Sequence, residues 1–164
     1  MAMQLRDVIR YFVQNYPYSD DLTKTRLTKM VYLTDWFSAQ QNKRTVTDIV
    51  WFFDHYGPYV TDVIDCASRD KELKVKSSST VYGTPKTLIA TKHPEASIDI
   101  PSLNDDDERL MQKVIDETKN FSWTKFIDYV YSTWPFVTQQ RYSELDLVKL
   151  AREEEEEIEA FLSN

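Results

Sequence analysis

Few side chains in this sequence have the types and spacing that catalysis requires. The single cysteine is Cys66, and the two histidines, His55 and His93, lie in different segments. A nucleophilic cysteine needs a nearby histidine and an electropositive setting. Asp62 and Asp65 precede Cys66 closely and work against a thiolate. We therefore interpret Cys66 as a core residue and expect no enzyme activity, no catalytic residue and no nucleophile.

Metal and cofactor sites have no sequence signal either. Neither histidine lies near a cysteine, so the spacing of zinc ligands is absent. The acidic run 105–108 opens a predicted helix, where it complements the helix dipole instead of converging on a cation. Two glycines leave no phosphate-binding loop. We expect no metal and no cofactor. An unrecognised hydrolase or transferase site, built from some of the 27 acidic residues, is the weakest alternative.

Charge is distributed unevenly along the chain. Residues 152–164 contain six glutamates and one arginine, and they supply most of the formal net charge of −7. We expect this stretch to be an acidic, solvated end of the last helix. A negative protein field disfavours phosphate backbones and favours a basic partner. Nucleic acid is therefore not the expected partner.

A nucleic-acid-associated regulator without catalysis, for example a phage-encoded one, is nevertheless the second hypothesis. The basic side chains that could serve it are Lys24, Arg26, Lys29, Lys43, Arg44, Lys71, Lys74 and Lys76. We interpret the lysines of the second predicted helix as surface residues whose stems cover apolar neighbours. Low-salt binding to nucleic-acid probes separates the two interpretations, because counterion release helps most there.

The length of 164 residues predicts a single domain over 1–164. No apolar run approaches the roughly 20 residues that a transmembrane helix needs. The start of the chain, residues 1–7, has no basic region followed by an apolar stretch, so no signal peptide is visible. We expect a cytoplasmic protein without a membrane partner.

Apolar periodicity predicts a mainly α fold, a multi-helix domain with a small β-hairpin or sheet element. The expected helices are 4–15, 21–40 with Ser19 as cap, one from Pro58 to about Arg69, one from Ser102 or Asn104 to about 118, one from Ser122 to Pro135, and one from a capping box at 143–146 to about 162. Residues 72–91 predict an antiparallel hairpin. The short apolar run 49–53 fits either a buried strand or a buried helical turn.

Aromatic residues are abundant, with 4 Trp, 10 Tyr and 8 Phe. A domain of this size cannot enclose every ring, and Tyr and Trp are enriched at the binding hot spots of protein interfaces. Many of these rings must fill the core. The others predict an aromatic surface for a protein partner, and the candidate partner-binding residues are Trp51, His55, Tyr59 and Trp134.

Two segments in the right order carry a resemblance to a known family. Residues 27–36 read Leu-Thr-Lys-Met-Val-Tyr-Leu-Thr-Asp-Trp, and residues 53–60 read Phe-Asp-His-Tyr-Gly-Pro-Tyr-Val. Together they resemble the Panacea domain, or SocA-like antitoxin domain. The chain departs from the family pattern at Thr34, where alanine is usual, at Tyr59, which separates the proline from the valine, and in lacking a Thr-His pair near the C-terminus.

The resemblance implies a mainly helical fold with a small sheet element and no catalysis. It implies a protein partner, a toxin encoded beside this protein, and in one branch of the family delivery of that toxin to a AAA+ protease. The matching motif residues are Lys29, Tyr32, Asp35, Tyr56, Gly57 and Pro58. Gly57 would supply a permissive backbone and Pro58 a helix start. Tyr32 and Asp35 share a helix face, where they either hold the turn at 56–58 by hydrogen bonds or face a partner.

Overall fold

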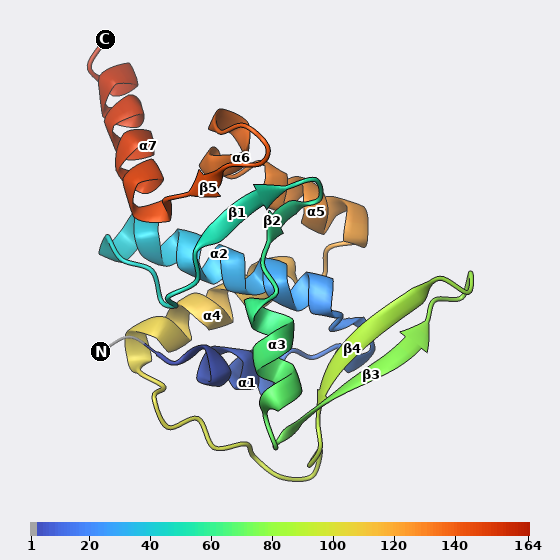
Figure 1. Cartoon of the computed structure of the whole chain (residues 1–164). Coiled ribbons are helices and arrows are strands. Elements are labelled where there is room, and N and C mark those ends of the chain that lie inside the picture. The colour runs from blue at the N-terminus through green and yellow to red at the C-terminus, as the bar shows by residue number, and fades with distance from the viewer. Residues whose placement is uncertain (1–2) are drawn as a thin grey trace.

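Helix α2 (Lys24–Asn42) is the central element of the computed structural model, which describes residues 3–164. It packs against α1, α3, α4, α7 and the strands β2 and β4, so it is covered on most sides (Figure 1). Its buried residues run almost without interruption from Arg26 to Ala39. A helix that is buried around most of its circumference lies in the protein core, and α2 forms the axis of the fold, with polar residues such as Lys29 and Asp35 among its buried side chains.

The other helices surround α2. They are α1 (Leu5–Asn15), α3 (Asp62–Arg69), α4 (Asp105–Thr118), α5 (Trp123–Tyr131), α6 (Trp134–Thr138) and α7 (Leu147–Leu162). The fold is therefore mainly α, as the sequence predicts. None of the helices in residues 3–164 has the length and apolarity needed to cross a bilayer.

Two small antiparallel sheets complete the fold. The first contains β1 (Trp51–Asp54), β2 (Gly57–Tyr59) and β5 (Glu144–Leu145) in the order β2-β1-β5. Phe52 lies opposite Tyr59 on one side and opposite Glu144 on the other. The second sheet is the hairpin of β3 (Leu73–Ser79) and β4 (Pro85–Thr91), which confirms the predicted hairpin at 72–91. The apolar run 49–53 enters a strand, not a helical turn.

Three predicted helix boundaries are wrong, and backbone pairing explains two of them. Pro58 lies in β2 opposite Phe53 and does not start a helix; α3 begins at Asp62. Pro135 lies in the first turn of α6 and does not end α5, because a proline in that turn needs no N–H bond. The residue range 143–146 is not a capping box: Glu144 and Leu145 pair with β1, and Asp146 caps α7.

The start of α2 also differs from the prediction. Ser19 does not cap it; residues Ser19–Asp21 form one 3-10 turn. Thr23 is the N-cap, and its hydroxyl oxygen accepts a hydrogen bond from the Arg26 N–H at 3.1 Å. Threonine is favourable at the N-cap because its hydroxyl oxygen accepts a hydrogen bond from a free N–H of the first turn.

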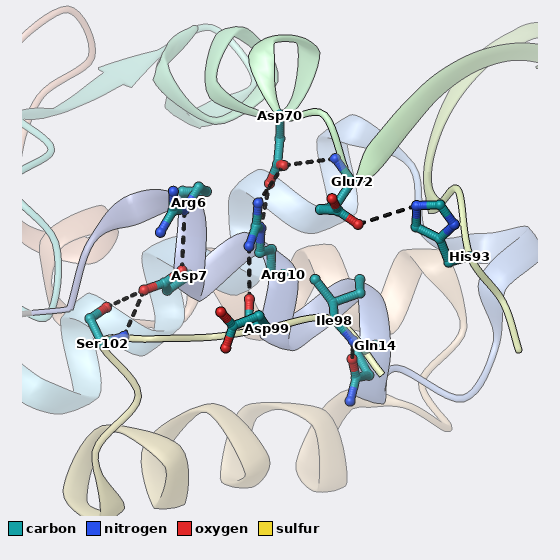
Figure 2. A network of polar contacts seen from close by, with 10 residues as sticks. All are labelled: Arg6, Asp7, Arg10, Gln14, Asp70, Glu72, His93, Ile98, Asp99 and Ser102. Carbon is teal, nitrogen blue, oxygen red and sulfur yellow. Dashed lines mark hydrogen bonds and ion pairs between the residues drawn. The ribbon is translucent and has the colours of Figure 1, made fainter. Parts of the chain in front are cut away.

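A polar network fixes the long connection 92–104 along α1 (Figure 2). The guanidinium of Arg10 donates two hydrogen bonds of 2.7 Å to the Asp70 carboxylate and one of 2.8 Å to the Asp99 carbonyl oxygen. The carboxylate of Asp7 accepts a hydrogen bond of 2.9 Å from the Ser102 N–H. The Arg10 guanidinium lowers the pKa of Asp70. The network therefore ties α1 to both ends of the segment that carries the β3–β4 hairpin.

Candidate functional site

The family-like residues of α2 face the β1–β2 hairpin and the loop that precedes it. Asp35 is fully buried, and its carboxylate accepts four hydrogen bonds. The Val46 and Thr47 N–H groups donate to Oδ1 at 2.9 Å each. The Thr47 hydroxyl and the Trp51 indole N–H donate to Oδ2 at 2.6 and 2.9 Å. Asp35 thus holds the entire approach to β1 in place.

The electrostatics of Asp35 reflect two opposing effects. Burial disfavours the charged carboxylate, and it raises the pKa of Asp35 to about 6. The hydrogen bonds from Thr47, Trp51 and Val46 favour the charged form and limit this rise. The side chain therefore remains largely ionised at neutral pH, as a buried anion that is fully surrounded by donors.

Tyr32 joins α2 to the segment after α5. Its hydroxyl lies 2.9 Å from the Thr133 hydroxyl. Its ring makes edge contacts with Trp51 and Phe136, at centroid distances of 5.5 and 5.3 Å. Burial raises the pKa of Tyr32. Tyr32 and Asp35 are therefore structural residues. Their side chains form hydrogen bonds to Thr133 and to residues 46–51. One sequence-based alternative expected these bonds to hold the turn at 56–58, and the structure does not show them there.

Trp51 does not belong to an exposed aromatic surface. It is 1% exposed, and its indole is enclosed by the Asp35 carboxylate and the Tyr32 ring. This corrects the expectation that Trp51 presents its ring to a partner. The reason is the alternation of β1, in which Trp51 and Phe53 face α2 while Phe52 and Asp54 are only partly covered.

The turn of the β1–β2 hairpin depends on Gly57. This residue has a φ of +99°, a region that residues with a Cβ rarely adopt. A Cβ atom placed there would lie 3.3 Å from the Cζ and hydroxyl oxygen atoms of Tyr131. The expected permissive role of Gly57 thus has a physical basis, and close packing against α5 adds a second reason for glycine.

Three aromatic side chains of the β1–β2 hairpin are exposed, two at its turn and one at the far end of β2. His55 is exposed, Tyr56 is 74% exposed and Tyr59 is 51% exposed. The His55 and Tyr56 rings make an edge contact at 4.8 Å between centroids. We call these three residues the hairpin surface. Of the four predicted partner-binding residues, only His55 and Tyr59 are exposed on this hairpin.

Trp134 occupies an intermediate position. Its side chain is partly buried against the core, at the start of α6. Its indole N–H is buried and has no hydrogen-bond partner among residues 3–164. Sequence reasoning missed two exposed side chains near β1, Val137 and Tyr142, of which Tyr142 donates its backbone N–H to the Phe53 carbonyl oxygen. A tyrosine in a short polar segment was the available signal.

Lys29, the first residue of the family-like set, lies beside β2. It is 4% exposed and lines a cavity of about 70 Å³ together with Pro58 and Tyr59. Burial lowers the pKa of Lys29 to about 8. In the sequence, Lys29 stands among the apolar residues of a helix, and this position could have indicated that the lysine is buried.

The basic residues considered for nucleic-acid binding do not form one free surface. Arg26 is 6% exposed and stacks on the Phe126 and Trp123 rings, at 4.7 and 5.5 Å from their centroids. Lys43 pairs with Glu155 on α7. Arg44 lies 3.3 Å from the buried Asp107 carboxylate. These three cations therefore make contacts within the chain. Of the lysines of α2 that were interpreted as surface residues, Lys24 is exposed as expected, whereas Lys29 is 4% exposed, which corrects the interpretation for that residue.

Cys66 lies half-buried in α3. Burial raises the pKa of the half-buried Cys66 thiol, which leaves it a poor nucleophile. In the described part of the chain, no three His, Cys, Asp or Glu side chains are grouped so as to hold a metal ion.

Comparison with known proteins identifies a family. The family model described as "Antitoxin SocA-like, Panacea domain" matches residues 27–135. No curated protein and no solved structure matches the chain significantly. The matched range contains both family-like segments, the β1–β2 hairpin and the β3–β4 hairpin.

Proposed function

The chain belongs to the SocA-like antitoxin family with a Panacea domain, and from this premise we propose that it neutralises a toxin by direct protein–protein contact. The toxin would be the product of the neighbouring reading frame, and the encounter would take place in the cytoplasm. The proposed role is non-catalytic. It uses shape and side-chain chemistry at a surface, for which no reacting group is needed.

The observation that carries the proposal is the construction of the hairpin surface. Exposed His55 and Tyr56 form the turn of the β1–β2 hairpin, and exposed Tyr59 ends β2 opposite Phe52. Buried contacts hold the hairpin beneath them. Asp35 fixes the approach to β1, and Tyr131 closes against Gly57. Rigid aromatic side chains lose little conformational entropy on binding, so a preorganised surface of this kind favours tight association.

The decisive experiment is a toxicity rescue. The neighbouring reading frame is expressed alone and then together with this protein, while growth and co-purification are measured. We expect growth arrest that is relieved by co-expression, with a stable complex. A Tyr56→Ala/Tyr59→Ala variant should lose both effects, whereas Tyr82→Ala, at the exposed tip of the other hairpin, should retain them. A harmless neighbour that forms no complex would contradict the proposal.

Neutralisation by delivery to a AAA+ protease is the more specific form of this proposal, and toxin lifetime tests it. If this protein is a proteolytic adaptor, the toxin's half-life in cells shortens when the two proteins are co-expressed. The effect should disappear when the protease is removed. A toxin that is inhibited but remains long-lived points to direct blocking of its active surface.

A further inference from the structure

A small cavity lies between the first turns of α2 and the segment that leads from β2 into α3. Its volume is about 70 Å³, roughly twice the ~30 Å³ that a water molecule occupies in the liquid. Pro58, Val60 and Ile64 form its apolar side. In Figure 1 the same segment runs across α2 before α3 begins. We call this cavity the Lys29 pocket. It is large enough for a carboxylate with one methylene group.

Lys29 gives the pocket a buried positive charge without a counter-charge. The side chain is more than nine-tenths buried, and it lines the cavity. Among residues 3–164 its ammonium group has no hydrogen-bond or ion-pair partner, and burial alone lowers its pKa. With a pKa of about 8 the group still carries its proton at neutral pH. The ammonium nitrogen keeps some contact with solvent at the open side of the cavity. An anion that enters there would replace this solvent and pair with a charge that the protein leaves little hydrated.

The remaining lining reinforces the preference for an anion. Lys24 adds a second ammonium group, and Thr25 and Thr61 add hydroxyl groups. No aspartate or glutamate lines the pocket, although the chain has 27 acidic residues and a net charge of −7. The pocket is therefore a positive depression in an acidic protein, and the charge complementarity selects a negatively charged occupant.

The position of the pocket indicates where that occupant comes from. Tyr59 lines the Lys29 pocket and also belongs to the hairpin surface. A partner that contacts Tyr59 would therefore lie directly beside the pocket. A short acidic side chain on that partner reaches the ammonium group with few atoms, in keeping with the cavity's volume.

We propose that the Lys29 pocket receives the carboxylate of an aspartate or glutamate side chain from the bound partner protein. The proposal rests on the proposed function, because it assigns a specific contact to the same complex. In the complex the carboxylate would accept hydrogen bonds from the Lys29 ammonium and from a threonine hydroxyl. A desolvated, charge-assisted contact of this type contributes specificity, because a partner without the acid leaves Lys29 unpaired.

The test uses the full chain and the toxin as purified proteins. Lys29→Met keeps the side chain's length and removes its charge; Lys74→Met, on the exposed face of β3, is the matched control. We expect Lys29→Met to weaken binding at least tenfold in calorimetric titration and Lys74→Met to leave it unchanged. Each exposed acid of the toxin is then replaced by alanine. One such variant should weaken binding to the wild-type protein but add nothing to the loss caused by Lys29→Met.

A second measurement works without relying on that variant. Nuclear magnetic resonance of the lysine side chains follows the titration of Lys29 in the free protein and in the complex. We expect the pKa of Lys29 to rise by at least one unit on binding, because an adjacent carboxylate stabilises the ammonium form. Unchanged affinity of Lys29→Met, together with an unchanged titration in the complex, would overturn the proposal.

The outcomes separate this proposal from the proposed function. If Tyr59→Ala abolishes binding and Lys29→Met does not, the hairpin surface binds the toxin and the pocket proposal is wrong. If the neighbouring protein does not bind at all, the proposed function fails. Sodium acetate then serves as the probe: saturable perturbation of Lys29 in the free protein supports a carboxylate site that takes a free ligand, and no perturbation overturns the site as well.

Discussion

Gly57 and Tyr131 are in such close contact that a methyl group at position 57 would lie 3.3 Å from two atoms of the tyrosine ring system, Cζ and the hydroxyl oxygen. The contact joins the β1–β2 turn to α5. Because the φ of Gly57 is also +99°, two independent constraints meet at one residue. The geometry of the hairpin surface therefore depends on a side chain that lies 74 residues away and is itself partly buried.

Replacing Gly57 by alanine should destabilise the protein. The positive φ costs about 1–3 kcal/mol for a residue with a Cβ, and the Tyr131 ring must also shift. Gly83→Ala is the matched control, because Gly83 has a φ of +78° but no atom within 4 Å of the added methyl group. Urea unfolding of both variants isolates the contact. Equal losses of unfolding free energy would show that the Tyr131 contact has no energetic effect.

Replacing Asp35 by asparagine should cost about 2–4 kcal/mol of unfolding free energy, because an amide nitrogen then faces donors at Oδ2 and the charge-assisted bonds are lost. Asp48→Asn is the control: Asp48 lies in the same loop but is exposed, so its change should stay within about 0.5 kcal/mol. Chemical denaturation monitored by tryptophan fluorescence measures both. A loss in Asp35→Asn no larger than in the control would contradict the buried role of the carboxylate.

The pH dependence of stability should report the raised pKa of Asp35. The folded protein binds this proton with a pKa of about 6, above the ordinary value of 3.8, so protonation between these values favours the folded state. The unfolding free energy of the wild type, relative to that of Asp35→Asn, should rise as the pH falls from about 7 to about 4. A difference that stays constant or falls over this range would disprove the assignment.

Lys29 should give the stability of the protein a pH dependence of opposite sign, in the alkaline range. Its pKa of about 8 in the folded protein lies below the ordinary value of 10.5, so the unfolded chain binds more protons between these values. The stability of the wild type relative to Lys29→Met should therefore rise with pH from about 8 to about 10.5. At pH 7 Lys29→Met should be the more stable protein, by up to about 3 kcal/mol. Lys24→Met, an exposed neighbour on the same helix, should show neither effect.

Affinity for the toxin should depend on single rings of the hairpin surface. Tyr59→Ala is expected to cost about 2 kcal/mol, or roughly 30-fold in dissociation constant, which is typical of an interface hot spot. Tyr82→Ala removes an equally exposed ring from the β3–β4 turn and should have no effect. Calorimetric titration with the purified toxin compares the two. An unaffected Tyr59→Ala would relocate the interface away from β2.

The sequence predicted the elements whose pattern is local. Helix α2 and the hairpin at 72–91 follow from apolar spacing and turn residues, and the two family-like segments predicted the antitoxin family that the family model confirms. Pro135 was misplaced because a proline can end one helix or lie in the first turn of the next, as it does in α6. Pro58 was misplaced because proline suits both a helix start and an edge strand. Only the pairing of β1 with its neighbours distinguishes these settings, and pairing partners are not visible in one sequence.

The candidate site was predictable only in part, for a similar reason. His55 and Tyr59 are exposed as expected, whereas Trp51 lies in the core. Side chains of a strand alternate between its two faces, and a run of aromatic residues does not show which face is buried. The position of the strand in the fold decides this. The enclosure of Lys29 depends on the segment 58–61 crossing α2, which is a contact between distant parts of the chain.

The pairing of β1 with β5 has a consequence for newly made protein. Residues 142–145 supply the outer strand and backbone bonds of β1, so the hairpin at 51–59 is complete only after the C-terminal part of the chain has been synthesised. At ~5–20 residues per second, the interval is on the order of ten seconds. A ribosome that stops between the two segments releases a chain with an unfinished surface. Only the full-length protein would then protect against a toxin. Incomplete chains would not compete with it for binding the toxin.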